Sequence, residues 1–365
     1  MMKVCHITSA HPADDVRIYH KECLSLAGAG YQVVLLVNGY KSFRSDLIEI
    51  RHLPGVRSRL LRMVVSPLIF FVYALRQKAG LYHLHDPELL PAGFLLKIFG
   101  RKVIYDAHED TPGQLLEKYY LPPLFRRLFA KVVRLLENLA ACFFDGVVAA
   151  TTGVKDNYPK DLQNKITPVR NYPDIREFSD LEPDGKERAV CYVGALSRSR
   201  GLDTMVDSLP HHGARLELAG YVYPADLLEQ ALDGIEESRI HYHGVTNRKG
   251  VREIFRNSSA GLVVLPNNNH HSLALPIKMF EYMAAGLPVI ASNIPLWRTI
   301  VEGHRCGVCI EPDDPALLGE TIEKLLSDEP LRKKMGENGR QAVAERYNWQ
   351  QEEQVLFDLY EKMIR

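Results

Sequence analysis

Lys278 and Glu281 are two charged residues, three positions apart, in a segment of helical character that follows Pro276. Proline beside a helix start is well tolerated because its missing N–H would have no partner there. Residues at three- and four-residue spacing share one helix face, so both side chains point the same way. The free N–H groups and positive dipole end of the helix suit a diphosphate, and Glu281 can accept hydrogen bonds from both hydroxyls of a ribose.

The same spacing also describes an ordinary surface ion pair, which contributes about 0.3–0.5 kcal/mol to stability. The helix has a natural end, because Gly286 suits the left-handed residue that closes many helices. Spacing alone therefore leaves two interpretations open, a nucleotide site and a surface ion pair.

Polar clusters follow three short apolar runs in the first half of the chain. They are Asp14-Asp15, His85-Asp86-Pro87-Glu88 and His108-Glu109-Asp110. In a parallel sheet the carboxyl ends of the strands meet at one edge, where ligands bind. A single cluster of this kind is often only a helix cap. Three clusters that converge on one edge favour a binding site.

The elements that would position these residues alternate between strand and helix. We expect strands at Lys3–Thr8, Gln32–Val37, Leu81–His85, Lys102–Ala107 and Gly146–Ala150, with a helix over Val16–Ala29 closed by Gly30. The apolar run Met63–Leu75 is too short to span a bilayer and is expected as a buried helix. This alternation implies right-handed βαβ units and a mostly parallel sheet.

A second alternation follows a turn-rich stretch, Asn171 to Gly185, that indicates a linker. We expect strands at Val190–Val193, Arg215–Ala219, Ile240–His243, Ala260–Leu265 and Val289–Ala291, helices at Leu202–Ser208, Val251–Asn257 and Ile277–Ala285, and a helical tail over Pro315–Arg365. The prediction is an α/β protein with two Rossmann-like, doubly wound domains, residues 1–172 and 186–345, that face a central cleft. Residues 346–365 are expected to return to the first domain.

Size and composition narrow the class of protein. A length of 365 residues favours two domains over one. The 45 basic and 45 acidic residues cancel, so nothing in the composition points to nucleic acid. Six scattered cysteines and no signal peptide suit a reducing compartment, so we expect a cytoplasmic protein. Cys306 and Cys309 form a C-x-x-C without two further zinc ligands, so no metal site is expected.

The segment from His270 to Ala291 resembles the C-terminal signature of the retaining glycosyltransferases of family 4, which have the GT-B fold. It is similar in particular to the bacterial surface-polysaccharide branch, with its pattern S-x-P-x-K-x-F-E-Y-M-A-A-G-x-P-V-I-A. Residues 192–201, 11–22 and 105–110 match further motifs of the family in the right order.

The resemblance implies roles for individual residues. The donor-binding set it implies is Arg198, Arg200, Gly244, Ser272, Leu273, Pro276, Ile277, Lys278 and Glu281. His108 is expected beside the donor sugar near the reacting carbon and, with Glu281, is assigned to catalysis. Candidates for acceptor binding are Asp14, Asp15, His85 and Glu109.

Two positions depart from the family pattern. Leu273 stands where the first carboxylate of an E-x7-E pair is expected, and Ala195 stands where an arginine commonly follows the glycine of the donor loop. Arg200 therefore takes the main diphosphate role, with Arg198 as helper. His270, His271 or backbone N–H groups of the loop are candidates to make the sugar contacts of the missing glutamate.

The activity implied is hexosyl transfer from a nucleoside-diphosphate sugar, UDP favoured, to a saccharide or polyprenyl-diphosphate-linked acceptor, with retention and without a metal or other cofactor. Positioned cations and a helix dipole would stabilise the leaving group. A nucleotide-sugar 2-epimerase of the same architecture and a non-catalytic sugar-binding protein are the alternatives. The absence of G-x-G-x-x-G after the first strand argues against an oxidoreductase.

The predicted helix Leu124–Leu136 combines an apolar stripe with basic residues. The stripe is Phe125, Leu128, Phe129, Val132 and Leu136, and the basic residues are Arg126, Arg127, Lys131 and Arg134. Such a helix can lie on an anionic membrane, which would place the protein on the inner membrane face. It can equally pack on the sheet with its charges in water.

Overall fold

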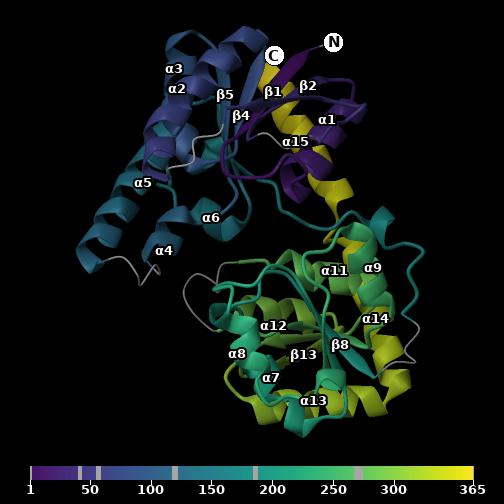
Figure 1. The fold of residues 1–365 in the computed structure, drawn as a ribbon. Helices are drawn as coiled ribbons and strands as arrows, with labels where there is room; N and C mark the ends of the chain where they lie inside the picture. The colour runs from purple at the N-terminus through teal and green to yellow at the C-terminus, as the bar shows by residue number, and fades with distance from the viewer. Residues whose placement is uncertain are drawn as a thin grey trace. The chain divides into compact units, whose positions relative to one another are not determined.

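The computed structural model describes residues 2–39, 43–54, 59–116, 122–183, 188–266 and 274–364. The chain divides into two compact units, Met1–Asn171 with Gln350–Arg365, and Tyr172–Trp349. Each unit contains a parallel sheet between helices (Figure 1). Helix α15 (Trp349–Ile364) lies in the first unit for nearly all of its length.

The first sheet has the described strand order β3-β2-β1-β4-β5-β6-β7, and every pair is parallel. The strands are β1 (Lys3–Thr8), β2 (Gln32–Asn38), β3 (Glu49–Leu53), β4 (Leu81–Leu84), β5 (Lys102–Ala107), β6 (Gly146–Ala149) and β7 (Ile166–Pro168). The order reverses between β1 and β4, which is the point where doubly wound sheets bind ligands.

Helices cover both faces of this sheet. Figure 1 shows α2 (Arg59–Gln77), α3 (Leu90–Ile98) and α5 (Pro123–Phe143) on one side, with α1 (Leu24–Gly28) and α15 on the other. The π-helix η1 (Val16–Cys23) leads directly into α1. The shorter elements are η2 (Pro87–Leu89), α4 (Thr111–Leu116), α6 (Thr152–Asp156) and η3 (Gln163–Lys165).

The second sheet has the order β10-β9-β8-β11-β12-β13, again with all described pairs parallel. The strands are β8 (Ala189–Val193), β9 (Arg215–Ala219), β10 (Ile240–Tyr242), β11 (Ala260–Val263), β12 (Val289–Ser292) and β13 (Gly307–Ile310). The helices are α7 (Leu202–Asp207), α8 (Leu227–Leu232), α9 (Arg248–Arg256), α11 (Ile277–Ala285), α12 (Pro295–Val301), α13 (Pro315–Ser327) and α14 (Glu329–Glu345), with the short turns η4 (Ile175–Glu177), η5 (Arg198–Arg200), η6 (Leu209–His211) and η7 (Glu237–Arg239). Two doubly wound parallel-sheet units confirm the predicted fold class.

Some local predictions were wrong or incomplete. Strand β3 was missed because it is a polar edge strand, and the short strands β7 and β13 were also missed. The segment Met63–Leu75 lies within α2 but is not a fully buried helix, since Leu68 is 56% exposed and Val72 43% exposed. The tail forms three separate helices, α13 to α15. All six cysteines, each in the described part, are free thiols.

Candidate active site

Helix α11 has the predicted bounds, from Ile277 after the N-cap Pro276 to Ala285 before Gly286. Gly286 has φ +80°, the left-handed conformation that glycine tolerates and that ends the helix. Among the described residues no side chain caps the N-terminus of α11, so its first N–H groups stay available to an anion. Every residue from Lys278 to Ala285 is buried, which fixes the helix against the sheet.

Lys278, on α11, places a buried amine beside the end of β8. Its Nζ lies 3.4 Å from the centroid of the Tyr192 ring and has no hydrogen-bond partner among the described residues. Burial, followed by the charge of Arg200, holds the pKa of Lys278 well below its usual value. An anion bound beside Nζ would reverse both effects, because a neighbouring negative charge favours the ammonium form.

Glycine is required where the loop after β8 passes Lys278. A Cβ on Gly194 would lie 2.6 Å from Lys278 Nζ, and a Cβ on Gly220 would lie 1.9 Å from the Gly194 carbonyl oxygen. Both glycines have positive φ, +146° and +137°. The loops that follow the neighbouring strands β8 and β9 therefore approach each other so closely that only glycine fits at these two positions.

Glu281 is 4% exposed and forms an ion pair with Arg248, whose Nη2 lies 2.7 Å from Glu281 Oε1. Arg248 also donates to both carboxylate oxygens of Glu177, at 2.6 and 2.8 Å. Burial would lower the pKa of Arg248, but the charges of the two carboxylates raise it. The alternative of a Lys278–Glu281 surface ion pair is therefore wrong: both residues are buried, and the ion-pair partner of Glu281 is Arg248.

The structure describes three further residues of the predicted donor-binding set. Arg198 and Arg200 lie on η5 at the carboxyl end of β8, and both are exposed. Arg198 pairs with Asp203 at 3.1 Å, whereas Arg200 lies near enough to lower the pKa of Lys278. The Gly244 carbonyl accepts a hydrogen bond from the Gly220 N–H at 2.8 Å.

The predictions for Ser272 and Leu273, and those for His270 and His271, lie outside the described residues. The loop is described again from Ala274, whose carbonyl accepts a hydrogen bond from Trp297 Nε1 at 2.8 Å.

In the first unit, Asp86 joins the loops that follow β1 and β4. Its Oδ2 accepts hydrogen bonds from Thr8 Oγ1 at 2.8 Å and from the N–H groups of Ser9 and Ala10 at 2.6 and 3.2 Å. Its Oδ1 lies 3.0 Å from His11 Nδ1. One buried carboxylate therefore fixes the first loop at the reversal point of this sheet.

His11 and Asp86 set each other's charge. Burial would lower the pKa of His11, but the hydrogen bond and charge of Asp86 outweigh burial and raise it to about 9. Burial likewise opposes the ionised form of Asp86, but His11 holds the pKa of Asp86 below its usual value. The ring of His11 meets that of His108 edge to face, with centroids 4.8 Å apart. A positively charged imidazole therefore lies beside the histidine that we predicted to be closest to the chemistry.

Asp106 orients the loop that carries His108. It accepts two hydrogen bonds from Arg17, at 3.0 and 2.9 Å, and lies 3.1 Å from His85 Nδ1. His108 Nδ1 is 3.9 Å from Asp106 Oδ2, beyond hydrogen-bond distance, and has no hydrogen-bond partner among the described residues. Burial opposes the charge of Asp106, but Arg17 and then His85 hold its pKa well below the usual value.

The four predicted acceptor-binding residues differ in accessibility. Asp14 and Glu109 are exposed, and Glu109 accepts a hydrogen bond from Gln114 at 2.6 Å. Asp15 caps η1, since its Oδ1 accepts from the N–H groups of Arg17 and Ile18, both at 2.9 Å. This is the helix-cap alternative of the sequence analysis.

The prediction that His85 binds the acceptor is corrected. Its side chain is fully buried, and its two ring nitrogens lie within hydrogen-bond distance of His6 and Asp106. An acceptor in solvent has no access to it. His85 instead holds Asp106, and through it the loop of His108.

Sequence reasoning missed three residues of the site. His11 and Asp86 were inside quoted motifs, but their pairing across 75 positions is set by the neighbouring positions of β1 and β4. Arg248 was not considered, because nothing in its local sequence links it to Glu281, 33 residues away. A signal was available only for Asp86, a polar residue directly after a buried strand.

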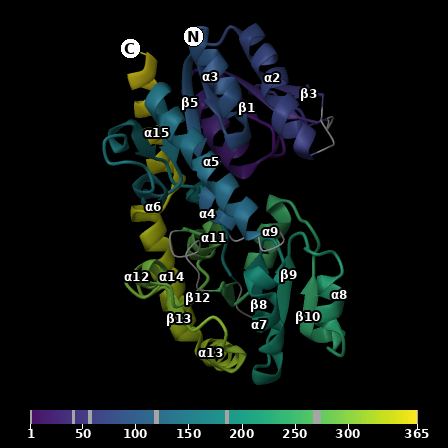
Figure 2. The ribbon, with the colours of Figure 1, turned by 90° about the vertical axis from the view of Figure 1, so that its left-hand side faces the viewer.

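Helix α5 can be followed in Figure 2, and more of its apolar side chains are exposed than predicted. Its exposed large apolar residues are Leu124, Phe125, Leu128, Phe129, Val132, Leu135, Leu139 and Phe143. Leu136, expected in the stripe, packs instead against the core. Arg134 is paired with Asp110 at 2.9 Å, and Arg126 donates to the Leu116 carbonyl at 3.2 Å. Arg127 and Lys131 remain exposed beside the stripe.

Two doubly wound parallel-sheet units, with a buried lysine near one switch point and a histidine pair near the other, place the protein in the GT-B fold class. Residues 17–175 match the family model described as Glycosyltransferase Family 4, and residues 174–342 match that of Glycosyl transferases group 1. The chain belongs to glycosyltransferase family 4 and is a transferase.

Relatives of this chain carry glycosyltransferase names. An uncharacterized glycosyltransferase of Methanocaldococcus jannaschii is 23% identical over 95% of this chain and 95% of its own length. A phosphatidyl-myo-inositol mannosyltransferase of Mycobacterium leprae is 27% identical over 87% of this chain and 80% of its own length.

Solved structures share the fold at low identity. A sucrose-phosphate synthase from Thermosynechococcus elongatus superposes with a TM-score of 0.78 at 16% identity, covering 100% of this chain and 99% of that one. HepE of Anabaena, solved with UDP and glucose, superposes with a TM-score of 0.77 at 15% identity. The match covers 99% of this chain and 100% of that one. WaaG, a glycosyltransferase involved in lipopolysaccharide biosynthesis, superposes with a TM-score of 0.73 at 16% identity. The match covers 96% of this chain and 98% of that one.

Proposed function

We propose that this glycosyltransferase uses a nucleoside-diphosphate sugar, with UDP as the favoured nucleotide, and retains the configuration of the transferred sugar. The observation that carries the proposal is the buried amine of Lys278, which has no hydrogen-bond partner among the described residues and lies at the uncapped start of α11. A diphosphate supplies the anion that this arrangement lacks. HepE of Anabaena, which shares the fold, was solved with UDP and glucose.

The cations of the second unit have a role in bond breaking. As the nucleotide leaves, negative charge grows on the diphosphate, and Lys278, Arg200 and the helix terminus stabilise it without reorganising. These groups do the work that a metal ion performs in other transferases, so the proposed reaction needs no metal at the diphosphate. Glu281, held by Arg248, presents a carboxylate to the ribose hydroxyls.

The first unit supplies the acceptor side of the proposal. His108 is assigned to the region of the reacting carbon on the resemblance to the family, and the adjacent His11 carries positive charge at neutral pH. Asp14 and Glu109 are exposed carboxylates available to an acceptor hydroxyl. Asp15 is assigned only a capping role, because its Oδ1 is occupied by two backbone N–H groups.

The acceptor that we favour is linked to a lipid, and the role that we favour is cell-surface polysaccharide synthesis at the inner membrane face. The support is the exposed apolar surface of α5 flanked by Arg127 and Lys131. Among the described residues no helix is both long and apolar enough to cross a bilayer. WaaG is involved in lipopolysaccharide biosynthesis, and the mycobacterial mannosyltransferase is named after phosphatidyl-myo-inositol; both molecules contain lipid.

One experiment tests the donor assignment. Thermal unfolding is measured with UDP, GDP, ADP and UMP for the wild type and for Lys278→Met. We expect UDP to raise the wild-type Tm most, UMP to raise it little, and Lys278→Met to lose most of the diphosphate effect. Equal shifts with UMP and UDP, or an unchanged UDP shift in Lys278→Met, would contradict the proposal.

A second experiment separates transfer from epimerisation. The 2-epimerase alternative binds the same donor but changes the sugar without an acceptor. Incubation with a UDP-sugar and a polyprenyl-diphosphate sugar should release UDP only when the acceptor is present. Conversion of the donor in its absence to a second UDP-sugar would favour the epimerase.

A further inference from the structure

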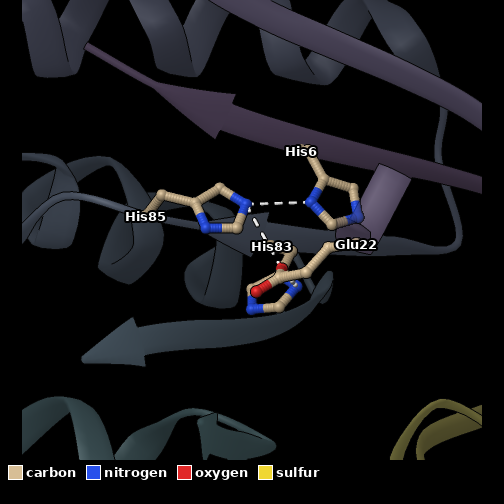
Figure 3. A group of neighbouring side chains, drawn as sticks. All are labelled: His6, Glu22, His83 and His85. Carbon is tan, nitrogen blue, oxygen red and sulfur yellow. Dashed lines mark hydrogen bonds and ion pairs between the residues drawn. The ribbon is translucent and has the colours of Figure 1, made fainter. Parts of the chain in front are cut away.

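Three histidines and a glutamate meet inside the first unit, away from solvent. His6, Glu22, His83 and His85 are all fully buried (Figure 3). His6 on β1 is the register partner of His83 on β4, and His85 follows two residues later on the same face of the sheet. Glu22 reaches them from η1, a π-helix, a local distortion that is frequent at functional sites.

The four side chains direct donor atoms toward one point. His6 Nδ1 and His85 Nε2 are 2.8 Å apart, while Glu22 Oε2 is 4.0 Å from His85 Nε2 and 3.8 Å from His83 Nδ1. One ligand atom from each residue lies within 4.8 Å of all the others. Tetrahedral zinc with bonds of about 2.0–2.1 Å spaces its ligand atoms about 3.3 Å apart. The distances between ligand atoms therefore need to change by no more than about 1.5 Å to hold such an ion.

The remaining atoms of three of these side chains are held from outside the cluster. His85 Nδ1 lies 3.1 Å from Asp106 Oδ2, and His6 Nε2 lies 3.1 Å from the hydroxyl of Tyr360 on α15. Glu22 Oε1 lies 3.1 Å from Arg17 Nε. Metal-bound histidines are oriented in this way, by a carboxylate or other oxygen on the nitrogen that faces away from the metal.

The cluster is not satisfied by protein groups alone. Neither oxygen of Glu22 has a hydrogen-bond partner among the described residues, since the contact with Arg17 is an ion pair of poor hydrogen-bond geometry. His83 Nε2 also has no hydrogen-bond partner there, whereas His83 Nδ1 lies 2.8 Å from the Tyr360 hydroxyl. A buried carboxylate without hydrogen bonds is costly, so each such group in a native fold calls for an explanation.

We propose that His6, Glu22, His83 and His85 bind a divalent transition-metal ion, with zinc as the preferred ion. Three imidazoles and one carboxylate make a closed four-ligand set, so the site is structural and has no open position for a substrate. The ion ties β1, β4 and η1 together beneath the loop of His108, with His85 as the link through Asp106. This reverses the sequence-based expectation that the chain holds no metal, and it does not depend on the proposed donor.

The first test is the metal content of the full-length wild-type protein. We expect about one zinc per chain by elemental analysis after purification without chelators, and visible absorption of tetrahedral type when cobalt replaces zinc. Removal of zinc by a chelator should lower the Tm, and zinc, but not magnesium, should restore it. Wild-type protein that is folded, metal-free and unchanged by added zinc or cobalt would overturn the proposal and leave a chain of hydrogen-bonded neutral imidazoles.

Matched variants assign the ion to this cluster. Glu22→Gln and His83→Gln should lose zinc and the cobalt absorption. The control is His241→Gln, in the partly exposed group Glu217, His241 and His243 of the second unit, which also brings metal-binding atoms together. This variant should keep both signals. If His241→Gln loses the ion while Glu22→Gln retains it, the metal belongs to the second group and the proposal is wrong.

Discussion

Arg248 Nη2 donates to Glu281 Oε1 at 2.7 Å, and the same guanidinium holds Glu177. The carboxylate that we assign to the ribose is thus ionised and held in place by a residue from another helix. Because an ionised carboxylate accepts hydrogen bonds and donates none, it suits a pair of sugar hydroxyls. Arg248 is therefore a positioning residue for the donor site.

Arg248→Leu should destabilise the protein by about 3 kcal/mol, because it leaves the buried Glu281 carboxylate without its partner. It should also raise the KM for the donor more than it lowers kcat. Urea unfolding and initial-rate kinetics measure the two effects. Arg256→Leu, which removes a surface pair with Glu253 from the same helix, is the control and should change neither by much. Equal effects of the two variants would refute the positioning role.

Lys278→Met should stabilise the ligand-free protein while it weakens UDP binding. Methionine fills the same space without a buried polar group that lacks a partner, and we expect this change to stabilise the protein by about 1–3 kcal/mol. Loss of a charge-assisted contact to the diphosphate should cost about 1.5–3 kcal/mol of binding free energy, roughly 10- to 100-fold in Kd. Urea unfolding tests the predicted gain in stability, and calorimetric titration tests the predicted loss of UDP affinity. A variant that is less stable and binds UDP normally would contradict both.

UDP binding to the wild type should also take up protons. The pKa of Lys278 is well below its usual value in the free protein, and a diphosphate would raise it. Titrations in buffers of different ionisation enthalpy should therefore give different apparent binding enthalpies at alkaline pH. In Lys278→Met the apparent binding enthalpy should no longer depend on the buffer. If it still does, the proton is taken up by another group.

The doubly wound fold could be predicted because its strands are apolar runs that alternate with helical patterns. Lys3–Thr8, Lys102–Ala107 and Arg215–Ala219 have the bounds expected from this pattern, as does Ile277–Ala285. The polar edge strand β3 could not be found, because its residues are mostly exposed or half-buried and its strand conformation comes from pairing with β2.

The site could be predicted only where one segment carries the signal. Lys278 and Glu281 share a helix, so spacing was enough to group them. The ion pairs of Arg248 with Glu281 and of His11 with Asp86 join distant segments, and no local pattern reveals them. His85 was assigned to acceptor binding because it belongs to a polar cluster after a strand, but its side chain lies on the same buried face of the sheet as that of His83.

The His11–Asp86 pair should make stability depend on pH above neutrality. The pKa of His11 rises from an ordinary value of 6.5 to about 9 on folding, so the folded state binds the proton more tightly. The resulting stabilisation is complete below about 6.5 and is lost as the pH rises to about 9. We expect a loss on the order of 1–3 kcal/mol over this range in urea unfolding. His11→Gln should flatten this part of the profile, and an unchanged slope would mean that another group titrates.

The exposed surface of α5 should bind anionic vesicles through Arg127 and Lys131. Each basic residue near an anionic surface contributes about 1 kcal/mol, so Arg127→Gln with Lys131→Gln should weaken binding roughly 30-fold. Arg134→Gln is the matched control, because Arg134 is already paired with Asp110 inside the unit. It should lower stability but leave vesicle binding nearly unchanged. Sedimentation with vesicles of neutral and anionic lipid measures the effect. Vesicle binding that is unchanged by the double substitution, or equal for neutral and anionic lipid, would contradict this prediction. It would favour the alternative in which the charges of α5 only face water.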